Sequence, residues 1–512
     1  VVSSKDSIAD LRAYEPLMDG QQISLLGHTV KGLGGGKFFH DASDTTSSDN
    51  NGTVIVTIGG KRWKRVIENH VSPEMFGALY SGADEKAELQ AAIDFVEGRN
   101  TKSDNFGTIK VVIGDGGITV GSAGDSYGIE VVNAAIEGVN VFCSSIVWGG
   151  DAGGTIVRYD SVYRTPFSKI RFKYADNMPA TCIDASWKDP SNSFGVFTDF
   201  GDIFKEIFFC DCTGPQLVVI NLVNAYLKDV RFSSGSNLVL VKQDGSGSAR
   251  RVISIRGWTV DYSLGATGVL ESMFKIDLTG AASVTLSLED ARIEGIGTDL
   301  GGVKAIVEVV DTVGPNLIPA SGISLVMKDI GVQLVGATDV SLIYHNTTQT
   351  SVTSDVMLEN VYLSGVDRIY GGNWNSFFKT PEPEVISNKN IVLWKTGRVE
   401  ETQRNRLPDH IGIGKDLLLG DESSGVTFSY GSGSPNGVRD DGKGSVFMRE
   451  TGSAGFTSYL KTTAKGTSTG WVNTTVWNPE STGGAGSAGS GNQYVSLNIG
   501  GFTYKILHDG TM

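Results

Sequence analysis

Cysteine and histidine are scarce in this chain. Its 512 residues include only four cysteines and six histidines. Four cysteines are too few for a disulfide framework in a chain of this length. The histidines are scattered, and no two of them stand at the spacing of a metal-binding pair. We therefore expect no disulfide scaffold, no metal site and no cofactor.

The sequence positions of the four cysteines do not indicate a metal-binding or redox site. They are Cys143, Cys182, Cys210 and Cys212. The Cys210-Asp-Cys212 spacing is compatible with a metal or redox pair, but no second Cys or His cluster in the sequence completes it. We therefore interpret all four cysteines as structural or inert side chains.

Long hydrophobic runs, an excess of positive charge and several common motifs are also absent. No apolar run approaches the roughly 18 residues that span a bilayer, and no signal peptide opens the chain. The net charge of −14 argues against binding to a nucleic-acid backbone. Neither a Gly-x-Ser-x-Gly elbow nor a phosphate-binding loop occurs. We expect no membrane insertion and no nucleic-acid partner, and the abrupt start at Val1 predicts a natural N-terminus upstream.

The chain is rich in glycine and contains a recurring sequence motif, called the phrase here, in which apolar residues alternate with other residues. Glycine fills 67 positions and charged residues only 20% of the total, which is typical of strands and turns. Each copy of the phrase has a turn-forming residue between two short alternating strands, which indicates two strands that meet at a bend. The phrase is clearest at Thr285–Glu294, and its bend residues are Asp229, Gly257, Asp290, Asp329 and Asn360.

The spacing of this phrase predicts the fold class. Successive bend residues lie 28, 33, 39 and 31 residues apart, and weaker copies of the phrase place further bends at Gly138, Lys169, Glu206 and Asn390. Strand-rich units that repeat at such intervals stack into a solenoid. We predict an all-β fold, a parallel β-helix of about nine rungs over residues 108–396.

One segment ahead of these repeats has a helical pattern. Residues 84–97 place four apolar side chains on one helical face, with acidic residues in the first turn and Gly98 just beyond. The apolar positions are Leu89, Ala92, Ile93 and Val96. A helix there would cover the open end of the solenoid, whose unpaired strand edges would otherwise invite aggregation.

Several segments, taken in order, resemble a known family. They are Asp6–Leu11, Gly34–Phe39, Asp41–Ser43, Asn51–Ile55, Arg62–Arg65, Pro73–Gly77 and Leu89–Ile93. Together they resemble the head module and capping helix of bacteriophage tailspikes. Three later segments resemble the small β module that ends many phage tail fibres and spikes, namely Gly444–Gly452, Thr457–Thr462 and Gly470–Val472. The resemblance implies a right-handed parallel β-helix, related to that of pectate lyases and assembled as a homotrimer.

The same resemblance implies a function. Such tailspikes are depolymerases that cleave a bacterial surface polysaccharide, either capsule or O-antigen, while the phage adsorbs to its host. The implied partners are this polysaccharide, two further copies of the chain, and other tail proteins contacted through a segment upstream of Val1. The implied location is the phage tail, where the protein acts outside the bacterium.

Composition shifts divide the chain into five parts. The charged stretch Arg398–Arg406 marks the end of the repeats. The predicted parts are an N-terminal β head module (1–77), a linker with the capping helix (78–107), the β-helix (108–396), a C-terminal β trimerisation module (397–480), and a Gly-rich linker with a last strand (481–512).

The repeat register predicts a pair of candidate catalytic acids. Strand residues alternate inward and outward, so the successors of the apolar inner stack (Phe232, Val260, Ile293, Val332 and Leu363) should face outward. Among these successors, Asp261 and Glu294 fall on adjacent rungs, with Arg231 and Arg292 beside them. Glycoside hydrolysis needs two such carboxyl groups, and arginines can hold an acidic sugar. A solvated ladder of weak ion pairs is the competing interpretation.

Other residues offer rival or supporting chemistry. The rival acids are Asp202 and Glu206, with Asp199 and Asp211, beside an aromatic segment that contains Trp187. Further candidates for contact with the sugar are Lys228, Arg256, Tyr226 and Tyr262. Trp258 falls at an inward position and is expected in the core, and the bend aspartates are expected to hydrogen-bond their own turns.

Three functions are compatible with this sequence. The first is an endo-acting glycosidase that uses Asp261 and Glu294 or the rival acids. The second is a polysaccharide lyase, in which a base removes the proton next to a uronate carboxyl group; Lys228, Arg231, Arg256 and Tyr262 are the candidates for that role. The third is a spike that binds the glycan without cleaving it.

Overall fold

The computed structural model divides the chain into two compact units, Val1–Asp409 and His410–Met512. It describes residues 3–99, 109–132, 134–159, 166–186, 204–220, 224–233, 235–243, 251–261, 272–278, 284–296, 305–311, 322–335, 340–347, 353–364, 366, 368–372, 385–394, 416–419, 426–431, 445–449, 457–463, 471–475, 493–499 and 502–508. The finer predicted boundaries at 77, 107, 396 and 480 remain predictions.

The first unit begins with a small β module. Helix α1 (Ile8–Arg12) starts at Ser7, whose hydroxyl accepts a hydrogen bond from the Asp10 backbone N–H in a capping box. Five strands form its sheet in the order β1-β2-β3-β5-β4. They are β1 (Ser3–Lys5), β2 (Gln22–Leu25), β3 (Gly36–His40), β4 (Val54–Val56) and β5 (Arg62–Arg65).

Strand β5 corrects one expectation from the sequence. The clustered positive charges of Lys61–Arg65 by themselves favour a solvated strand face, but the alternation of β5 turns Trp63 and Arg65 into the module. The Arg65 guanidinium donates hydrogen bonds to three backbone carbonyls, those of Gly34, Gly35 and Gly52. Burial lowers the pKa of Arg65 to about 10. This arginine therefore holds the glycine-rich turns of the module in place.

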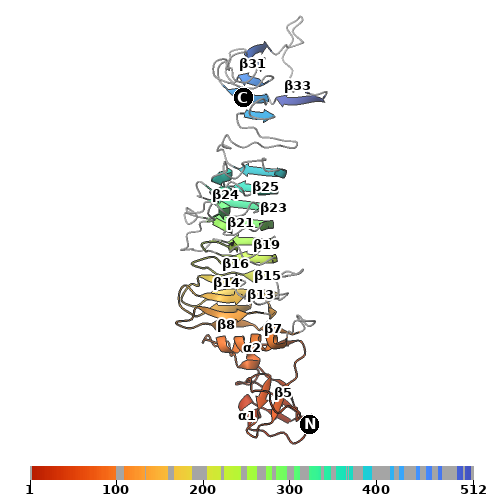
Figure 1. Cartoon of the computed structure of the whole chain (residues 1–512), viewed down its shortest axis with the longest axis vertical. Coiled ribbons are helices and arrows are strands. Elements are labelled where there is room, and N and C mark those ends of the chain that lie inside the picture. Colours follow the sequence, from red (N-terminus) through yellow and green to blue (C-terminus); the bar gives the residue numbers. More distant parts are fainter. Residues whose placement is uncertain are drawn as a thin grey trace, which may run out of the picture. The chain divides into compact units, whose positions relative to one another are not determined.

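The remainder of the first unit is a parallel β-helix (Figure 1). Among the described residues, one sheet has 13 strands and is called the first sheet here. Its members are β6 (His70–Val71), β7 (Lys110–Ile113), β8 (Gly116–Val120), β10 (Ile136–Gly138), β11 (Ser144–Trp148), β13 (Phe167–Tyr174), β15 (Phe204–Phe208), β17 (Asn224–Phe232), β19 (Arg251–Asp261), β21 (Val284–Ile296), β23 (Gly322–Val335), β25 (Thr353–Ser364) and β27 (Val385–Trp394).

The other sheet, called the second sheet here, has nine described strands. They are β9 (Tyr127–Val131), β12 (Thr155–Tyr159), β14 (Thr181–Ser186), β16 (Leu217–Ile220), β18 (Val239–Gln243), β20 (Ser272–Leu278), β22 (Ala305–Asp311), β24 (Ser341–Thr347) and β26 (Arg368–Gly372). From β11 onward, strands of the two sheets alternate along the chain, and the pairing within each sheet is parallel, for example between β19 and β21. The predicted solenoid is confirmed.

Seven of the nine predicted bends are confirmed by the backbone conformation, and the bend at Asn390 remains a prediction. Six non-glycine residues of the first sheet have φ between 52° and 57°: Lys169, Glu206, Asp229, Asp290, Asp329 and Asn360. This left-handed region is unfavourable for most side chains, and Asp and Asn tolerate it best. Gly257 has φ +66°, and an added Cβ there would lie 2.6 Å from the Asp229 Oδ1. Each of these rungs therefore turns at one left-handed residue.

Gly138 does not follow this rule. Its φ lies outside the left-handed region, whereas a Cβ added to it would lie 2.1 Å from the Lys169 carbonyl oxygen. Gly138 therefore ends β10 at the register position of the bend residue Lys169, without the left-handed conformation of the other bends. Glycine occupies this position because the next rung passes too close for a side chain.

The interior of the β-helix is apolar, as predicted. The inner stack Phe232, Val260, Ile293, Val332 and Leu363 is buried throughout. Aromatic rings continue it: Phe209 stacks on Phe232 at 5.0 Å between centroids, and Trp258 meets Phe274 edge-on at 4.9 Å. Trp258 is fully buried, which confirms its assignment to the core.

Helix α2 (Lys86–Arg99) covers the N-terminal end of this core. Its residues Leu89, Ala92, Ile93 and Val96 are fully buried and join the hydrophobic cluster of the β-helix. The short 3-10 helix η1 (Pro73–Phe76) contributes Phe76 to the same cluster. The predicted capping helix is confirmed, but it begins and ends two residues later than the predicted 84–97, so Gly98 lies inside it rather than beyond it.

The second unit contains two small sheets. One has the order β28-β29-β30-β31-β32, and the other is an antiparallel pair of β33 and β34, where the sequence predicted one last strand. Their bounds are β28 (Asp416–Leu419), β29 (Val426–Gly431), β30 (Val446–Arg449), β31 (Thr457–Lys461), β32 (Trp471–Thr475), β33 (Gln493–Ile499) and β34 (Phe502–His508). Among all described residues, no helix is both long and apolar enough to cross a membrane.

Candidate functional site

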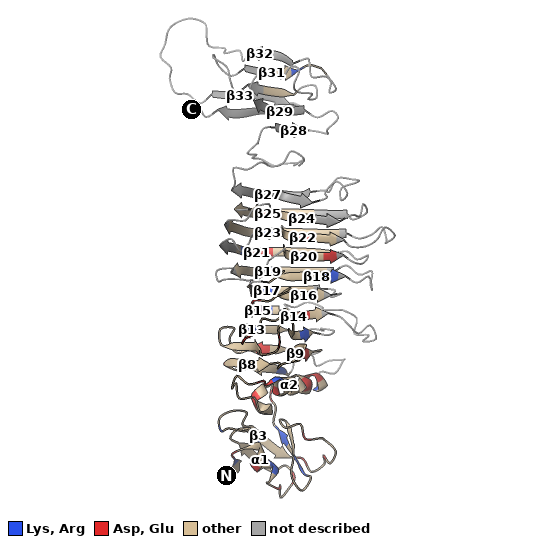
Figure 2. Cartoon of the chain, turned by 90° about the vertical axis from the view of Figure 1, so that its left-hand side faces the viewer, with Lys and Arg blue, Asp and Glu red and all other residues tan. Residues whose placement is uncertain are grey.

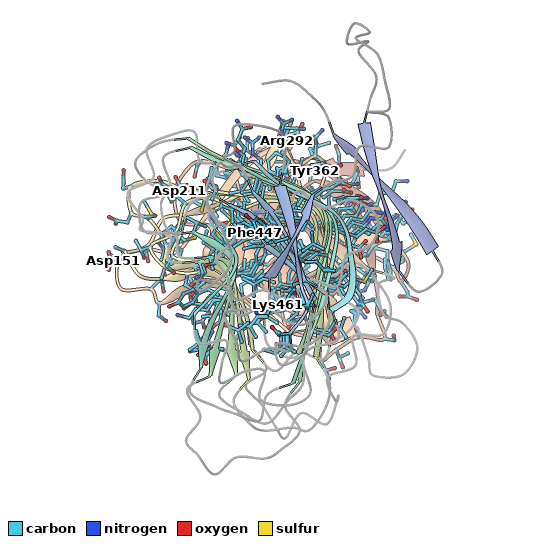
Figure 3. The ribbon with its side chains drawn as sticks, turned by 90° about the horizontal axis from the view of Figure 1, so that it is seen from above. Asp151, Asp211, Arg292, Tyr362, Phe447 and Lys461 are labelled. Carbon is cyan, nitrogen blue, oxygen red and sulfur yellow. The ribbon has the colours of Figure 1, made fainter. Side chains whose placement is uncertain are left out.

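An exposed column of arginine and aromatic residues runs along the outside of the first sheet. Backbone register links its members from rung to rung. We call this set the arginine column: Arg171, Phe208, Arg231, Thr259, Arg292, Gly331 and Tyr362. The side chains of Arg231 and Arg292 are exposed, and Arg292 and Tyr362 lie on the same side of the coil (Figure 3). The predicted outward position of this column is confirmed.

Each of the two candidate acids lies two residues after a member of the arginine column: Asp261 after Thr259, and Glu294 after Arg292. Asp261 and Glu294 are register partners on adjacent strands, and Gln333 is the partner of Glu294 on the next strand. Neighbouring rungs are about 4.8 Å apart. Gln333 is exposed, so this column of the sheet faces outward at β23. The side chains of Asp261 and Glu294 lie outside the described part of the chain, as do Trp187, Asp199, Asp202 and Tyr262 altogether.

Phe208, an aromatic residue that the sequence did not single out, lies near one end of the arginine column, next to Arg171. The Arg231 guanidinium lies over the Phe208 ring, 5.8 Å from its centroid. Phe142 meets the Phe208 ring edge-on at 5.4 Å and is 69% exposed. Exposed rings beside cations are suited to the apolar face and the carboxylate of an acidic sugar.

A second column of the first sheet, on the strand halves that precede the bends, consists of charged residues. Its register runs through Lys205, Lys228, Arg256, Glu289, Lys328 and Glu359. Lys328 and Glu359 lie 3.8 Å apart. The Arg256 side chain donates to Asp290 at 2.9 Å, and this hydrogen bond raises the pKa of Arg256. We call these six residues the charge ladder, because a charged side chain follows on every rung and several of them pair with a neighbouring residue of opposite charge.

The structure separates the described rival acids from the pair on β19 and β21. Glu206 occupies the left-handed bend of β15 and lies 3.6 Å from Lys205, two rungs before β19. Asp211 follows β15 and accepts a short hydrogen bond from the Ser233 hydroxyl. Glu206 and Asp211 therefore have structural partners in the described part of the chain.

The second sheet carries acids that the sequence reasoning missed. Lys275 on β20 is the register partner of Glu308 on β22, which in turn pairs with Tyr344 on β24. Lys242 on β18 pairs with Asp277 on β20, so the end of β18 is blue beside the red end of β20 (Figure 2). Asp277 lies two residues along the strand from Lys275, so the Asp277 and Glu308 backbones are roughly 8 Å apart.

Of these missed acids, Glu308 is buried and Asp277 is half-buried. Glu308 is only 5% exposed, and its carboxylate accepts a hydrogen bond from the Ser272 hydroxyl at 2.8 Å. The Asn237 side chain donates in turn to the Ser272 hydroxyl at 3.0 Å. The Asp277 Oδ1 atom is buried without a hydrogen-bond partner among the described residues. A polysaccharide chain has no direct approach to a carboxylate as enclosed as Glu308.

A weak sequence signal for this group exists. Lys275 follows the bend residue Gly257 by 18 positions, and Glu308 follows Asp290 by the same 18. The register partners in the neighbouring rungs have other offsets. Leu240 follows Asp229 by 11 positions, and Tyr344 follows Asp329 by 15. The segments between the sheets therefore differ in length, so the register of the first sheet does not extend to the second by counting alone.

Comparison with known proteins gives its clearest result for the head module. Residues 4–68 match the model of the phage tail protein small four-stranded beta-sheet domain. This match confirms the resemblance predicted for the N-terminal module.

Two curated relatives match a limited length of the chain. A Mu-like prophage FluMu defective tail fiber protein of Haemophilus influenzae is 35% identical over 91 residues, which is 17% of this chain and 14% of the relative. A capsule K2-specific depolymerase of Klebsiella phage vB_KpnP_KpV74 is 36% identical over 97 residues, which is 19% of this chain and 17% of the relative. The chain thus spans less than a fifth of the length of these relatives.

A solved structure with similar extent is the tailspike of Acinetobacter phage vb_AbaP_AS12. Its superposition covers 100% of this chain and 99% of that chain, with 12% sequence identity and a TM-score of 0.48. The parallel β-helix of this chain rests on its own strand pairing, and its head module is similar to that of phage tail proteins.

Proposed function

We propose that this chain is a phage tailspike depolymerase that hydrolyses internal glycosidic bonds of a bacterial surface polysaccharide, capsule or O-antigen. The observation that carries the proposal is the register of Asp261 and Glu294, two carboxyl residues on adjacent rungs beside the arginine column. The match of residues 4–68 to a phage tail domain and the similarity to a capsule-specific depolymerase support the biological setting.

The two acids would divide the work of hydrolysis. One carboxylic acid protonates the oxygen of the leaving sugar, and the other carboxylate either attacks the anomeric carbon or activates a water molecule. Rungs about 4.8 Å apart allow the roughly 5 Å carboxyl separation of a retaining enzyme, and longer side-chain reach allows the wider separation of an inverting one. Both stereochemical outcomes are compatible with this spacing.

The arginine column would hold the polymer across several rungs. Arg231 and Arg292 lie two rungs apart in the register, with Thr259 between them, which is about 9.6 Å along the axis. Phe208 and Tyr362 extend the same column in both directions. Such a surface is suited to an acidic polysaccharide, because guanidinium groups pair with carboxylates and aromatic rings stack on sugar faces.

A lyase acting on the same polymer is the second candidate. The residue types that would remove the proton next to a uronate carboxyl group are present at Lys228, Arg231 and Arg256 in the first sheet and at Tyr262. Arg256 is already paired with Asp290, which makes it a poor base. A spike that only binds glycan is the third possibility.

Product analysis separates these three functions. The chain is incubated with purified capsule or O-antigen, and reducing ends, ultraviolet absorbance and polymer length are followed together. Hydrolysis yields reducing ends without new absorbance, whereas a lyase creates an absorbing unsaturated uronate. Unchanged polymer length together with retained binding would identify a non-catalytic spike and contradict the proposal.

Assembly is a further part of the proposal. By its similarity to phage tail proteins, the chain would work as a homotrimer on the virion tail. Sedimentation equilibrium of the purified chain tests this directly. A mass three times that of one chain is expected, and a monomer at micromolar concentration would contradict the homotrimer.

A further inference from the structure

Three cysteines that stand apart in the sequence meet inside the β-helix. Cys182 lies on β14, and Cys210 and Cys212 lie between β15 and β16. The Cys182 Sγ is 3.4 Å from the Cys210 Sγ and 3.4 Å from the Cys212 Sγ. All three sulfur atoms lie within 4.8 Å of one another. Rung stacking brings them together, because β14 and β16 are neighbouring strands.

A backbone oxygen completes this group. The Cys210 carbonyl accepts hydrogen bonds from the Cys182 Sγ at 3.8 Å and the Cys212 Sγ at 3.6 Å. In a tetrahedral Zn²⁺ site with bonds of about 2.3 Å to sulfur and about 2.1 Å to oxygen, the ligand atoms lie about 3.6 to 3.8 Å apart. Four of the six separations, from the Cys182 Sγ to the other two sulfurs and from the Cys210 carbonyl oxygen to the Cys182 and Cys212 sulfurs, are close to the edges of such a tetrahedron. The two sulfur–sulfur separations must grow by only about 0.4 Å.

The surroundings favour neutral thiols until a metal ion arrives. All three cysteines are buried. Burial raises the pKa of the Cys182 and Cys212 thiols, and the hydrogen bond with Cys182 is the main cause that raises the pKa of Cys210. Three bare thiolates would bring a charge of −3 into this apolar interior, whereas three thiolates around Zn²⁺ carry −1. A divalent, sulfur-preferring ion therefore suits this group better than an alkaline-earth ion.

We propose that Cys182, Cys210, Cys212 and the Cys210 carbonyl form a structural Zn²⁺ site that fastens β14 to the segment entering β16. On binding, three S–H bonds break, three Zn–S bonds form, and three protons pass to the buffer. The site takes no part in cleavage, and it stabilises the β-helix where the chain passes from the first sheet to the second.

Metal titration of the full chain tests this proposal. The protein is purified under reducing conditions, stripped with a chelator and titrated with Co²⁺, whose thiolate charge-transfer and tetrahedral ligand-field bands report the ligand set. We expect saturation at one Co²⁺ per chain, displacement by Zn²⁺, and a higher Tm for the Zn²⁺-loaded protein. Because this readout uses the wild-type chain, it does not depend on any variant folding.

Two cysteine variants provide the matched comparison. Cys182→Ser is expected to lose the thiolate bands and the Zn²⁺-dependent rise in Tm. Cys143→Ser is the control, because Cys143 is exposed and lies outside the group, and it should behave like the wild type. Cobalt bands that persist unchanged in Cys182→Ser would overturn the proposal.

Thiol counting identifies the competing uses of these cysteines. The metal-free reduced wild type has four free cysteines. If it shows no cobalt bands while all four thiols react after unfolding, the group is ordinary core packing and the proposal fails. If only two thiols react in protein purified without reductant, and that protein binds no metal, a Cys182 disulfide replaces the metal site and the proposal again fails.

Discussion

The outer faces of the two β-helix sheets carry similar residue types in opposite surroundings. On the first sheet, Arg231 and Arg292 are exposed and stand in register beside Asp261 and Glu294. On the second sheet, Glu308 is buried and tied to Ser272 by a hydrogen bond. An acid that must reach a polymer has to be accessible, whereas an acid enclosed in a hydrogen-bond chain is suited to holding strands together. The contrast separates a candidate for catalysis from a candidate for structure.

The largest expected effect lies on the first sheet. Asp261→Asn and Glu294→Gln should each lower the rate of polysaccharide cleavage by about 10²- to 10⁴-fold, because each removes a proton donor or nucleophile. The measurement is the initial rate of reducing-end release at saturating polymer. Far-ultraviolet circular dichroism confirms that each variant keeps its fold, and a folded variant with an unchanged rate would remove that acid from the mechanism.

The arginine column and the charge ladder should differ in their effect on substrate binding. Arg292→Ala should weaken binding of an acidic polysaccharide by about tenfold, the loss of one charge-assisted contact. Arg256→Ala, the matched control in the charge ladder, should change binding less than twofold, because Arg256 is paired with Asp290. Binding to immobilised polymer at two salt concentrations gives both values. Equal losses for the two variants would erase the distinction between the columns.

The enclosed acid on the second sheet should affect stability. Glu308→Ala removes the acceptor of the Ser272 hydroxyl and should cost about 1 to 3 kcal/mol of stability, the usual penalty for a buried polar group left without a partner. Thermal melting checks this, with Lys275→Ala, the register partner of Glu308, as the comparison. A Glu308→Ala protein with unchanged Tm would show that the enclosed carboxylate is not structural.

The smallest effect concerns an ion-pair group at the start of the first sheet. Burial alone would raise the pKa of Glu137, but hydrogen bonds from Lys110 and Lys169 outweigh it and hold that pKa below its ordinary value of 4.5. A carboxylate with a lowered pKa stabilises the fold above its unfolded-state pKa and loses this contribution as the pH falls through the folded-state value. Stability from Glu137 should therefore be present at pH 6 and absent at strongly acidic pH.

Glu137→Gln tests this pH dependence. The variant should be less stable than the wild type by at most about 1 kcal/mol at pH 6, since such exposed pairs are weak. The difference in Tm should shrink as the pH is lowered below 4.5. A difference that grows in acid would contradict the assignment.

The bends of the first sheet were accessible to sequence analysis because their geometry restricts the residue. A left-handed bend favours Asp, Asn or Gly, so Asp290 and Asn360 mark the register. Once that register was known, alternation placed Ile293 in the core and Arg292 on the outside. The fold and the arginine column could therefore be predicted from one phrase.

The second sheet and the cysteine group could not be predicted in this way. The segment between a bend and the following strand of the second sheet varies in length, so no constant offset marks Glu308 or Cys182. Cys182 contacts Cys210 and Cys212 only because successive rungs stack. The sequence spacing of these cysteines does not predict this contact. The burial of Arg65 could not be predicted for a related reason. The backbone carbonyls that accept its hydrogen bonds, those of Gly34, Gly35 and Gly52, are distant in the sequence.

The central claim is that Asp261 and Glu294 of the first sheet cleave the polysaccharide and that the buried Glu308 of the second sheet does not. The most direct test compares reducing-end release by Glu294→Gln and Glu308→Gln on the same polymer, at a temperature where both variants are folded. We predict that Glu294→Gln loses at least about 100-fold in rate and that Glu308→Gln keeps a rate within about twofold of the wild type. The reverse result, a fast Glu294→Gln and an inactive but folded Glu308→Gln, would contradict the account and move the site to the second sheet.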